Sequence, residues 1–277
     1  MREEVCAEIV ALYEGEERGL FARLVREGFD ALGGGRAAEG LRRLERAAAL
    51  APENGPLNAY LGVHYFGKGK TGLARDYLSR SFVADPENER VQLLLGLACG
   101  DEGEPERARA LLSEAVRRGG HSFAAHCALG RLAAAEADWK TALTEFKRAL
   151  AARPCPEAHY LLALLYYETG RDRSALKHLR KALELDATYV AAIYLMGLAY
   201  ERLGEHKRAR DYFESARALR AGGGREASSR RGASRGAGGA PTLLASKGKG
   251  KRRLVTGGDE RLAAALQADA LGLAAPR

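Results

Sequence analysis

The sequence predicts an all-α protein, a right-handed α-solenoid of about six helix–turn–helix repeats followed by a basic tail. The first observation is compositional: Ala, Leu, Arg and Glu dominate, and the 277 residues include only 8 Pro and 7% aromatics. These are strong helix formers. The second is an apolar motif that returns every 33 or 34 residues, and the third is a set of small residues in the same register. Such a period is typical of repeats that stack on their neighbours.

The apolar motif marks the second helix of each repeat. It has Ala at its first position, Phe or Leu four residues later and Ala or Ser seven residues later. Residues at this spacing share one face of a helix. The copies, of which the first is the weakest, are Gly40/Leu44/Ala47, Ala74/Leu78/Ser81, Ala108/Leu112/Ala115, Ala142/Phe146/Ala149, Ala175/Leu179/Ala182 and Ala209/Phe213/Ala216.

Two series of small residues mark the first helix and the turn. In the first helix, a small residue allows the second helix to approach closely. In the turn, Gly ends the first helix by adopting a left-handed backbone conformation. The helix series is Gly28, Gly62, Gly96, Gly130, Ala163 and Gly197, and the turn series is Gly35, Gly69, Gly103, Ala137, Gly170 and Gly204.

This arrangement resembles the tetratricopeptide repeat. Its spacing of Leu-Gly-x-x-Tyr, then Ala, Phe, Ala and Pro, is met by Leu61-Gly62-x-x-Tyr65, Ala74 and Pro86. It is met again from Met196-Gly197-x-x-Tyr200 to Ala216, whereas Glu27 and Cys99 depart from it. The predicted units of the array 21–223 are 21–54, 55–88, 89–122, 123–155, 156–189 and 190–223.

The two ends differ from the array. Residues 1–20 carry Val5, Ile9 and Leu12 at helical spacing, which predicts a helix that caps the first unit; a dimerisation helix is the alternative. Residues 224–258 are rich in Gly, Ser, Arg and Lys and are predicted to be disordered. Residues 259–277 form a short Ala/Leu-rich stretch that is compatible with a helix, which would be marginal in isolation.

The resemblance implies a concave groove lined by the first helices, in which a protein partner, as a peptide or an amphipathic helix, would bind. Packing against neighbouring helices or the cap is the alternative role for some of these residues. Val25 and Phe29 replace the polar residues with which chaperone-binding members hold a carboxylate, so that ligand is disfavoured. Arg90, Arg131 and Arg202 are expected to be solvated. The predicted groove residues are Phe29, Val63, Phe66, Leu93, Leu97, Arg131, Tyr160, Leu164, Tyr167, Tyr194 and Leu198.

Charge is concentrated in the tail. The net charge is +8, and residues 222–277 carry 11 Lys/Arg and 4 Asp/Glu, which leaves the rest nearly neutral. An accessory role in binding nucleic acid or another anionic surface through this tail is therefore the alternative function, although a solvated linker is the simpler interpretation. Without aromatics the tail cannot stack on bases, so such contact would be weak and non-specific. Its basic run comprises Lys247, Lys249, Lys251, Arg252 and Arg253.

No catalytic, cofactor or metal site is predicted. The six His are scattered, and residues 67–71 imitate a phosphate-binding loop but have His64 where that loop needs Gly. The four Cys lack a CxxC pairing, no signal peptide is recognisable, and no apolar run reaches 18 residues. The sequence thus predicts a non-enzymatic, cytoplasmic adaptor without a membrane span.

Overall fold

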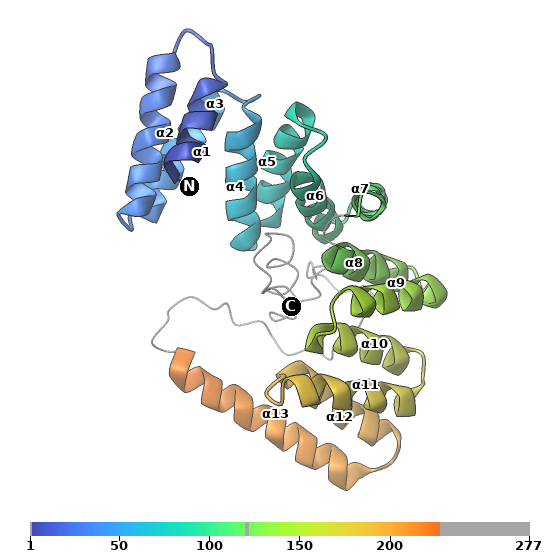
Figure 1. The fold of residues 1–277 in the computed structure, drawn as a ribbon. Helices are drawn as coiled ribbons and strands as arrows, with labels where there is room; N and C mark the ends of the chain where they lie inside the picture. The colour runs from blue at the N-terminus through green and yellow to red at the C-terminus, as the bar shows by residue number, and fades with distance from the viewer. Residues whose placement is uncertain (1, 120–121, 228–277) are drawn as a thin grey trace. The chain divides into compact units, whose positions relative to one another are not determined.

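The computed structural model describes residues 2–119 and 122–227, and every regular element in that part of the chain is an α-helix (Figure 1). The all-α prediction is therefore confirmed. The chain divides into two compact units, residues 1–120 and 121–277, each of which has its own packed helices.

The N-terminal unit consists of a short helix and three helical hairpins. In each hairpin the second helix packs along the first, and α5 also packs against α6 of the following hairpin. The helices are α1 (Arg2–Ala11), α2 (Arg18–Gly33), α3 (Ala37–Leu50), α4 (Gly55–Gly67), α5 (Thr71–Ala84), α6 (Glu89–Glu102) and α7 (Pro105–Arg117).

The C-terminal unit repeats the hairpin three times. Here α9 packs against α10 and α11 against α12, while the first helices α8, α10 and α12 contact one another in order. The helices are α8 (Ser122–Ala135), α9 (Trp139–Ala152), α10 (Pro156–Glu168), α11 (Asp172–Leu185), α12 (Val190–Arg202) and α13 (His206–Ala227).

All six predicted turn positions have a left-handed backbone, as the sequence indicated. The φ angle is positive at the five Gly, for example 78° at Gly35 and 74° at Gly170. It is also positive, at 60°, at Ala137. A residue with a Cβ atom resists this conformation, so the fourth repeat carries local strain that the other five repeats avoid.

The small residues of the first helices allow close packing, as predicted. A Cβ atom added to Gly62 would lie 2.6 Å from Cγ of Leu78, and one added to Gly197 would lie 2.5 Å from a ring carbon of Phe213. Both distances are too short for real atoms. In the five repeats that have Gly at this position, the large residue of the second helix therefore packs directly on the backbone of its own first helix.

The large residue of the apolar motif is fully buried in five of the six copies. The sixth, Phe213, is only half-buried, because within the described residues α12 is the principal packing partner of α13. The five buried residues are Leu44, Leu78, Leu112, Phe146 and Leu179.

The ends of the array differ from the predicted boundaries. The N-terminal helix covers only residues 2–11, and α2 begins at Arg18, within the segment assigned to the cap. α13 continues to Ala227, past residue 223 where the array was predicted to end. The remainder of the linker and the stretch 259–277 lie outside the described residues, as does the basic run from Lys247 to Arg253.

Candidate protein-interaction faces

The predicted groove residues all lie on the first helices, and the structure divides them by exposure. Seven are buried, including Arg131, which is only 3% exposed. The buried members are Phe29, Phe66, Leu93, Leu97, Arg131, Tyr160 and Leu164, and the half-buried members are Val63, Tyr167, Tyr194 and Leu198.

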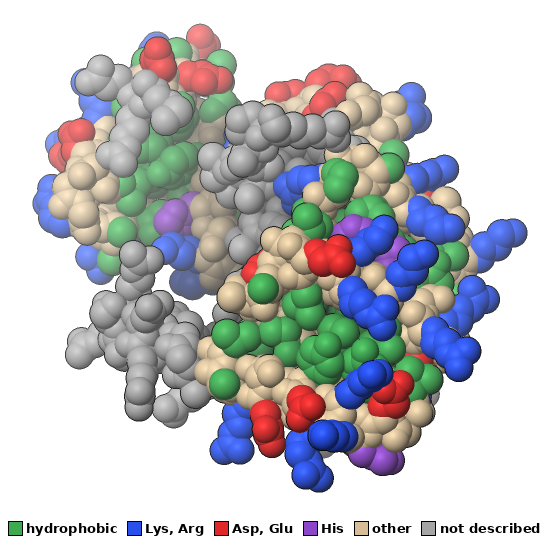
Figure 2. Space-filling view, turned by 60° about the horizontal axis from the view of Figure 1, so that its bottom comes forward, with side chains coloured by type: hydrophobic (Ala, Val, Ile, Leu, Met, Phe, Trp, Pro, Cys, Tyr) green, Lys and Arg blue, Asp and Glu red, His purple; other side chains and the backbone are tan. Residues whose placement is uncertain are grey.

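The half-buried members are the predicted groove residues that remain partly accessible at the surface. Three of them lie in the C-terminal unit, where α10 carries Tyr167 and α12 carries Tyr194 and Leu198. Figure 2 shows hydrophobic side chains on this unit with Lys and Arg side chains around them. Partly exposed tyrosines combine a large apolar surface with a polar tip, which suits them to protein interfaces.

Arg202 is not the solvated cation that the sequence predicted. Its Nε donates to both carboxylate oxygens of Asp172, at 2.8 Å each, and its guanidinium lies 3.8 Å from the ring centre of Tyr167. It also donates to the backbone carbonyl of Tyr167. Burial raises the pKa of the Tyr167 hydroxyl above its usual range. Arg202 therefore joins α12 to the end of α10 and the start of α11, and it positions Tyr167. The expectation of solvation was also wrong for Arg131, which is buried.

The first-helix face of the N-terminal unit is partly covered by α1, which contacts both α2 and α4 (Figure 1). The ring of Tyr13 lies 4.6 Å from that of Phe21, and Cys6 lies within electrostatic range of Arg26 and Asp30. Tyr13, just beyond the end of α1, thus meets the start of α2, and Cys6 within α1 lies near later residues of α2, so the two helices run antiparallel. Burial raises the pKa of the Cys6 thiol.

Asn54 joins the end of α1 to the start of α4. Its Oδ1 accepts a hydrogen bond from the amide of Leu57 at 3.0 Å, which caps α4, and its Nδ2 donates to the carbonyl of Ile9 at 2.9 Å. The carbonyls in the last turn of a helix lack partners within that helix. Asn88 caps α6 in the same way, accepting from Val91 at 3.1 Å. Neither cap was predicted from the sequence, although Asn directly before a helix is a recognised start signal.

α1 is held by few contacts. Ile9 is its one fully buried side chain among those described, while Val5, Cys6 and Val10 are half-buried. Burying one such aliphatic side chain stabilises by about 1.5–3 kcal/mol. An isolated helix of this length is marginal in water, so the docked helix depends on this anchor and on Asn54.

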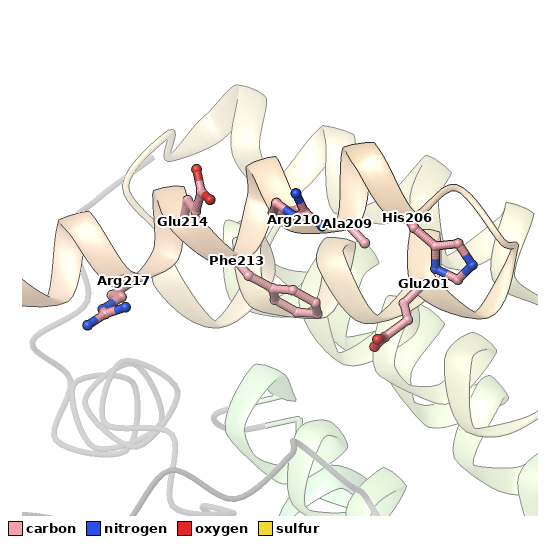
Figure 3. A pocket seen from close by; sticks show the side chains of 7 residues that line it. All are labelled: Glu201, His206, Ala209, Arg210, Phe213, Glu214 and Arg217. Carbon is pink, nitrogen blue, oxygen red and sulfur yellow. The ribbon is translucent and has the colours of Figure 1, made fainter.

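A hollow of about 520 Å³ lies at the end of the C-terminal unit, on α13 and the last turn of α12 (Figure 3). Figure 3 shows Phe213 projecting from α13 into it. Arg210 and Arg217 occupy the positions held by Leu176 and Leu183 in the preceding repeat, one residue after each Ala of the motif. The lining residues are Glu201, His206, Ala209, Arg210, Phe213, Glu214 and Arg217.

A pair of histidines lies within the fifth repeat. Nδ1 of His159 on α10 is 3.3 Å from Nδ1 of His178 on α11, and Tyr166 stacks on His178. Burial, followed by the nearby imidazole of His159, lowers the pKa of His178 to about 4. In the described part of the chain, no three His, Cys, Asp or Glu side chains gather as metal ligands would.

Comparison with known families decides what this architecture is. Residues 25–89 and 61–123 match the family described as tetratricopeptide repeat, and residues 135–216 match that of anaphase-promoting complex, cyclosome, subunit 3. The chain is a tetratricopeptide-repeat protein. A general role in protein interaction is what this family indicates.

Individual relatives of this tetratricopeptide-repeat protein differ in size from it. Superkiller complex protein 3 of Mus musculus is 32% identical over 142 residues, which are 48% of this chain but only 9% of that relative. A crystal structure of MamA is similar with a TM-score of 0.52 at 26% identity, covering 60% of this chain and 97% of that one. A chain of the APC/C hetero-tetramer Cut9–Hcn1 has a TM-score of 0.55 at 20% identity, covering 64% and 35% respectively, and supports the fold alone.

Within residues 2–119 and 122–227, no helix combines the length and apolar character needed to cross a membrane.

Proposed function

We propose that this tetratricopeptide-repeat protein is a non-enzymatic adaptor that binds an apolar segment or amphipathic helix of a partner protein through its first-helix faces. The observation that carries the proposal is the half-buried group of Tyr167, Tyr194 and Leu198 on adjacent first helices α10 and α12. The four cysteines are free thiols, and we place the adaptor in the cytoplasm, where thiols remain reduced.

The structure determines which substitutions can test this face. Tyr160 and Leu164 are only 3% and 2% exposed, so a charge at either position would disrupt packing as well as binding. Leu198 is half-buried and accepts a carboxylate at its surface edge with less cost. Leu185, at the end of second helix α11, is 55% exposed and provides the same substitution away from the first-helix face.

The test compares full-length wild type, Leu198→Glu and Leu185→Glu as baits, with partners identified by mass spectrometry and helical content checked by circular dichroism. We expect a partner that is retained by wild type and Leu185→Glu and lost from Leu198→Glu. Equal capture by all three baits would contradict the proposal.

A chain truncated after residue 227, where α13 ends, distinguishes the alternative role of the basic tail. The first-helix proposal expects this chain to retain the partner. Loss of the partner on truncation, together with strong salt sensitivity of the full-length complex, would instead assign binding to the tail.

A further inference from the structure

We propose that α1 is an intramolecular occupant of a helix-binding site on the N-terminal unit, and that a partner's amphipathic helix displaces it. This inference deepens the proposed function, since it names a second site and the kind of partner helix that fits it. The site lies along α2 and at the N-terminus of α4, where α1 now contacts both helices.

The site is built to hold the C-terminal end of a helix. The Nδ2 group of Asn54 donates to the carbonyl of Ile9, in the last turn of α1, while its Oδ1 caps α4. The negative end of the α1 dipole thus lies at the positive end of the α4 dipole, a favourable arrangement. One asparagine serves both helices, and the donor half is available to any helix that ends at the same place.

The side-chain contacts of α1 specify the partner. Ile9 is the fully buried anchor in the last turn of α1, and Tyr13, just beyond the end of this helix, packs its ring on Phe21. Between them Leu12, the first residue after α1, is 62% exposed and makes no comparable contact with the unit. A fitting partner is therefore an amphipathic helix, antiparallel to α2, with a branched aliphatic residue in its last turn and an aromatic residue just beyond its C-terminal end.

Displacement is feasible because α1 is held by only one fully buried side chain among its described residues, by the hydrogen bond from Asn54 and by a short connection. The connecting residues 12–17 form no helix and lead directly into α2. A site that is occupied by an internal competitor has a lower apparent affinity for an external ligand. The affinity is reduced in proportion to the fraction of molecules in which the site is vacant. Releasing α1 while leaving α2 and α4 intact should therefore strengthen binding of an external helix.

The experiment uses full-length protein and a fluorescein-labelled peptide of residues 2–14 as the probe. Ile9→Asp in the protein removes the anchor of α1, and Leu12→Asp, at the exposed residue directly after α1, is the matched control. By fluorescence anisotropy, we expect Ile9→Asp to bind the probe at least about tenfold more tightly than wild type or Leu12→Asp. A probe that itself carries Ile9→Asp should not bind.

A second pair of variants locates the site. In the Ile9→Asp background, adding Asn54→Asp keeps an acceptor that caps α4 but replaces the Nδ2 donor by a carboxylate oxygen. We expect about a tenfold loss of probe affinity. Adding Asn88→Asp, the same substitution at the cap of α6, should leave the affinity unchanged.

A folding defect in Ile9→Asp would not leave the inference without a test. A protease site introduced within residues 14–17 allows α1 to be cut from wild-type protein that is already folded, after which the probe should replace the cut segment with saturable binding. Equal probe affinity for Ile9→Asp and Leu12→Asp, or no exchange after cleavage, would overturn the inference. A concentration-dependent dimer that Ile9→Asp abolishes would also overturn it, by making the occupant a second copy of the chain. None of these results bears on Leu198 in the other unit, so this inference can fail while the proposed function holds.

Discussion

The two units each contain the same hairpin three times, yet they differ in their turn residues, in the caps of their first helices and in the burial of the motif residue. In the N-terminal unit every turn position is Gly, and the first helices α4 and α6 begin with the side-chain caps Asn54 and Asn88. In the C-terminal unit, α10 and α12 begin without a side-chain cap, one turn has Ala137, and Phe213 is half-buried. The repeat motif sets the fold in both units, while these local features set its stability. We therefore expect the C-terminal unit to unfold first.

The largest expected effect compares the same motif position at the two ends of the array. Leu44→Ala removes a fully buried side chain and should destabilise by about 2–4 kcal/mol, because it leaves a cavity. Phe213→Ala should cost less, about 1–2 kcal/mol, although more atoms are removed, because the ring is already half in water. Hydrogen exchange in α3 and α13 at increasing urea measures the two costs. Equal losses of unfolding free energy in the two variants would contradict the expected difference between the two ends of the array.

A medium effect, confined to the C-terminal unit, is expected on acidification. The pKa of His178 is lowered to about 4 in the folded state, against an ordinary value near 6.5. Between these pH values the unfolded chain binds more protons than the folded chain. The free energy of unfolding is therefore highest above about pH 6.5 and falls as the pH drops toward 4. After allowance for solvent screening, the loss is on the order of 1–2 kcal/mol.

Unfolding of the C-terminal unit as a function of pH tests this effect. His178→Gln should flatten the dependence between pH 4 and 6.5, because the titrating imidazole is gone. His206→Gln, at an exposed histidine on α13, should retain it. A pH profile that is identical for wild type and His178→Gln would remove the histidine pair from the comparison of the units.

The smallest expected effect concerns the turns. Ala137→Gly should stabilise the C-terminal unit by about 0.5–1 kcal/mol, because it relieves a positive φ of 60°. Gly170→Ala, the reverse change in the next repeat, should destabilise by a similar or larger amount. Thermal unfolding of both variants measures the change. A loss of stability in Ala137→Gly would mean that the methyl group of Ala137 contributes packing that outweighs the strain.

Features that depend on local spacing could be predicted from the sequence. A positive φ at Gly35 or Gly170 follows from the turn alone, and the contact of Gly62 with Leu78 follows from one hairpin. Each requires only residues that are close along the chain and that repeat at a fixed interval. Six copies of the pattern made these positions easy to recognise.

Features that occur once, or that join distant residues, could not be predicted. The Ile9–Asn54 bond spans 45 residues and has no counterpart in another repeat to reveal it. The pairing of Arg202 with Asp172 spans 30 residues, and its geometry depends on the packing of three helices. The solvent exposure of the groove residues could not be predicted either. The repeat pattern places Leu164 and Leu198 at equivalent positions, although only Leu164 is buried.

The bond between Asn54 and Ile9 also sets an order of events during synthesis. The last-turn carbonyl of Ile9 obtains the Nδ2 donor of Asn54 only after the ribosome has added 45 further residues. At about 5–20 residues per second, this delay is about 2–9 s. During that interval α1 can pack only on α2, so its docking is complete only once the start of α4 has been made.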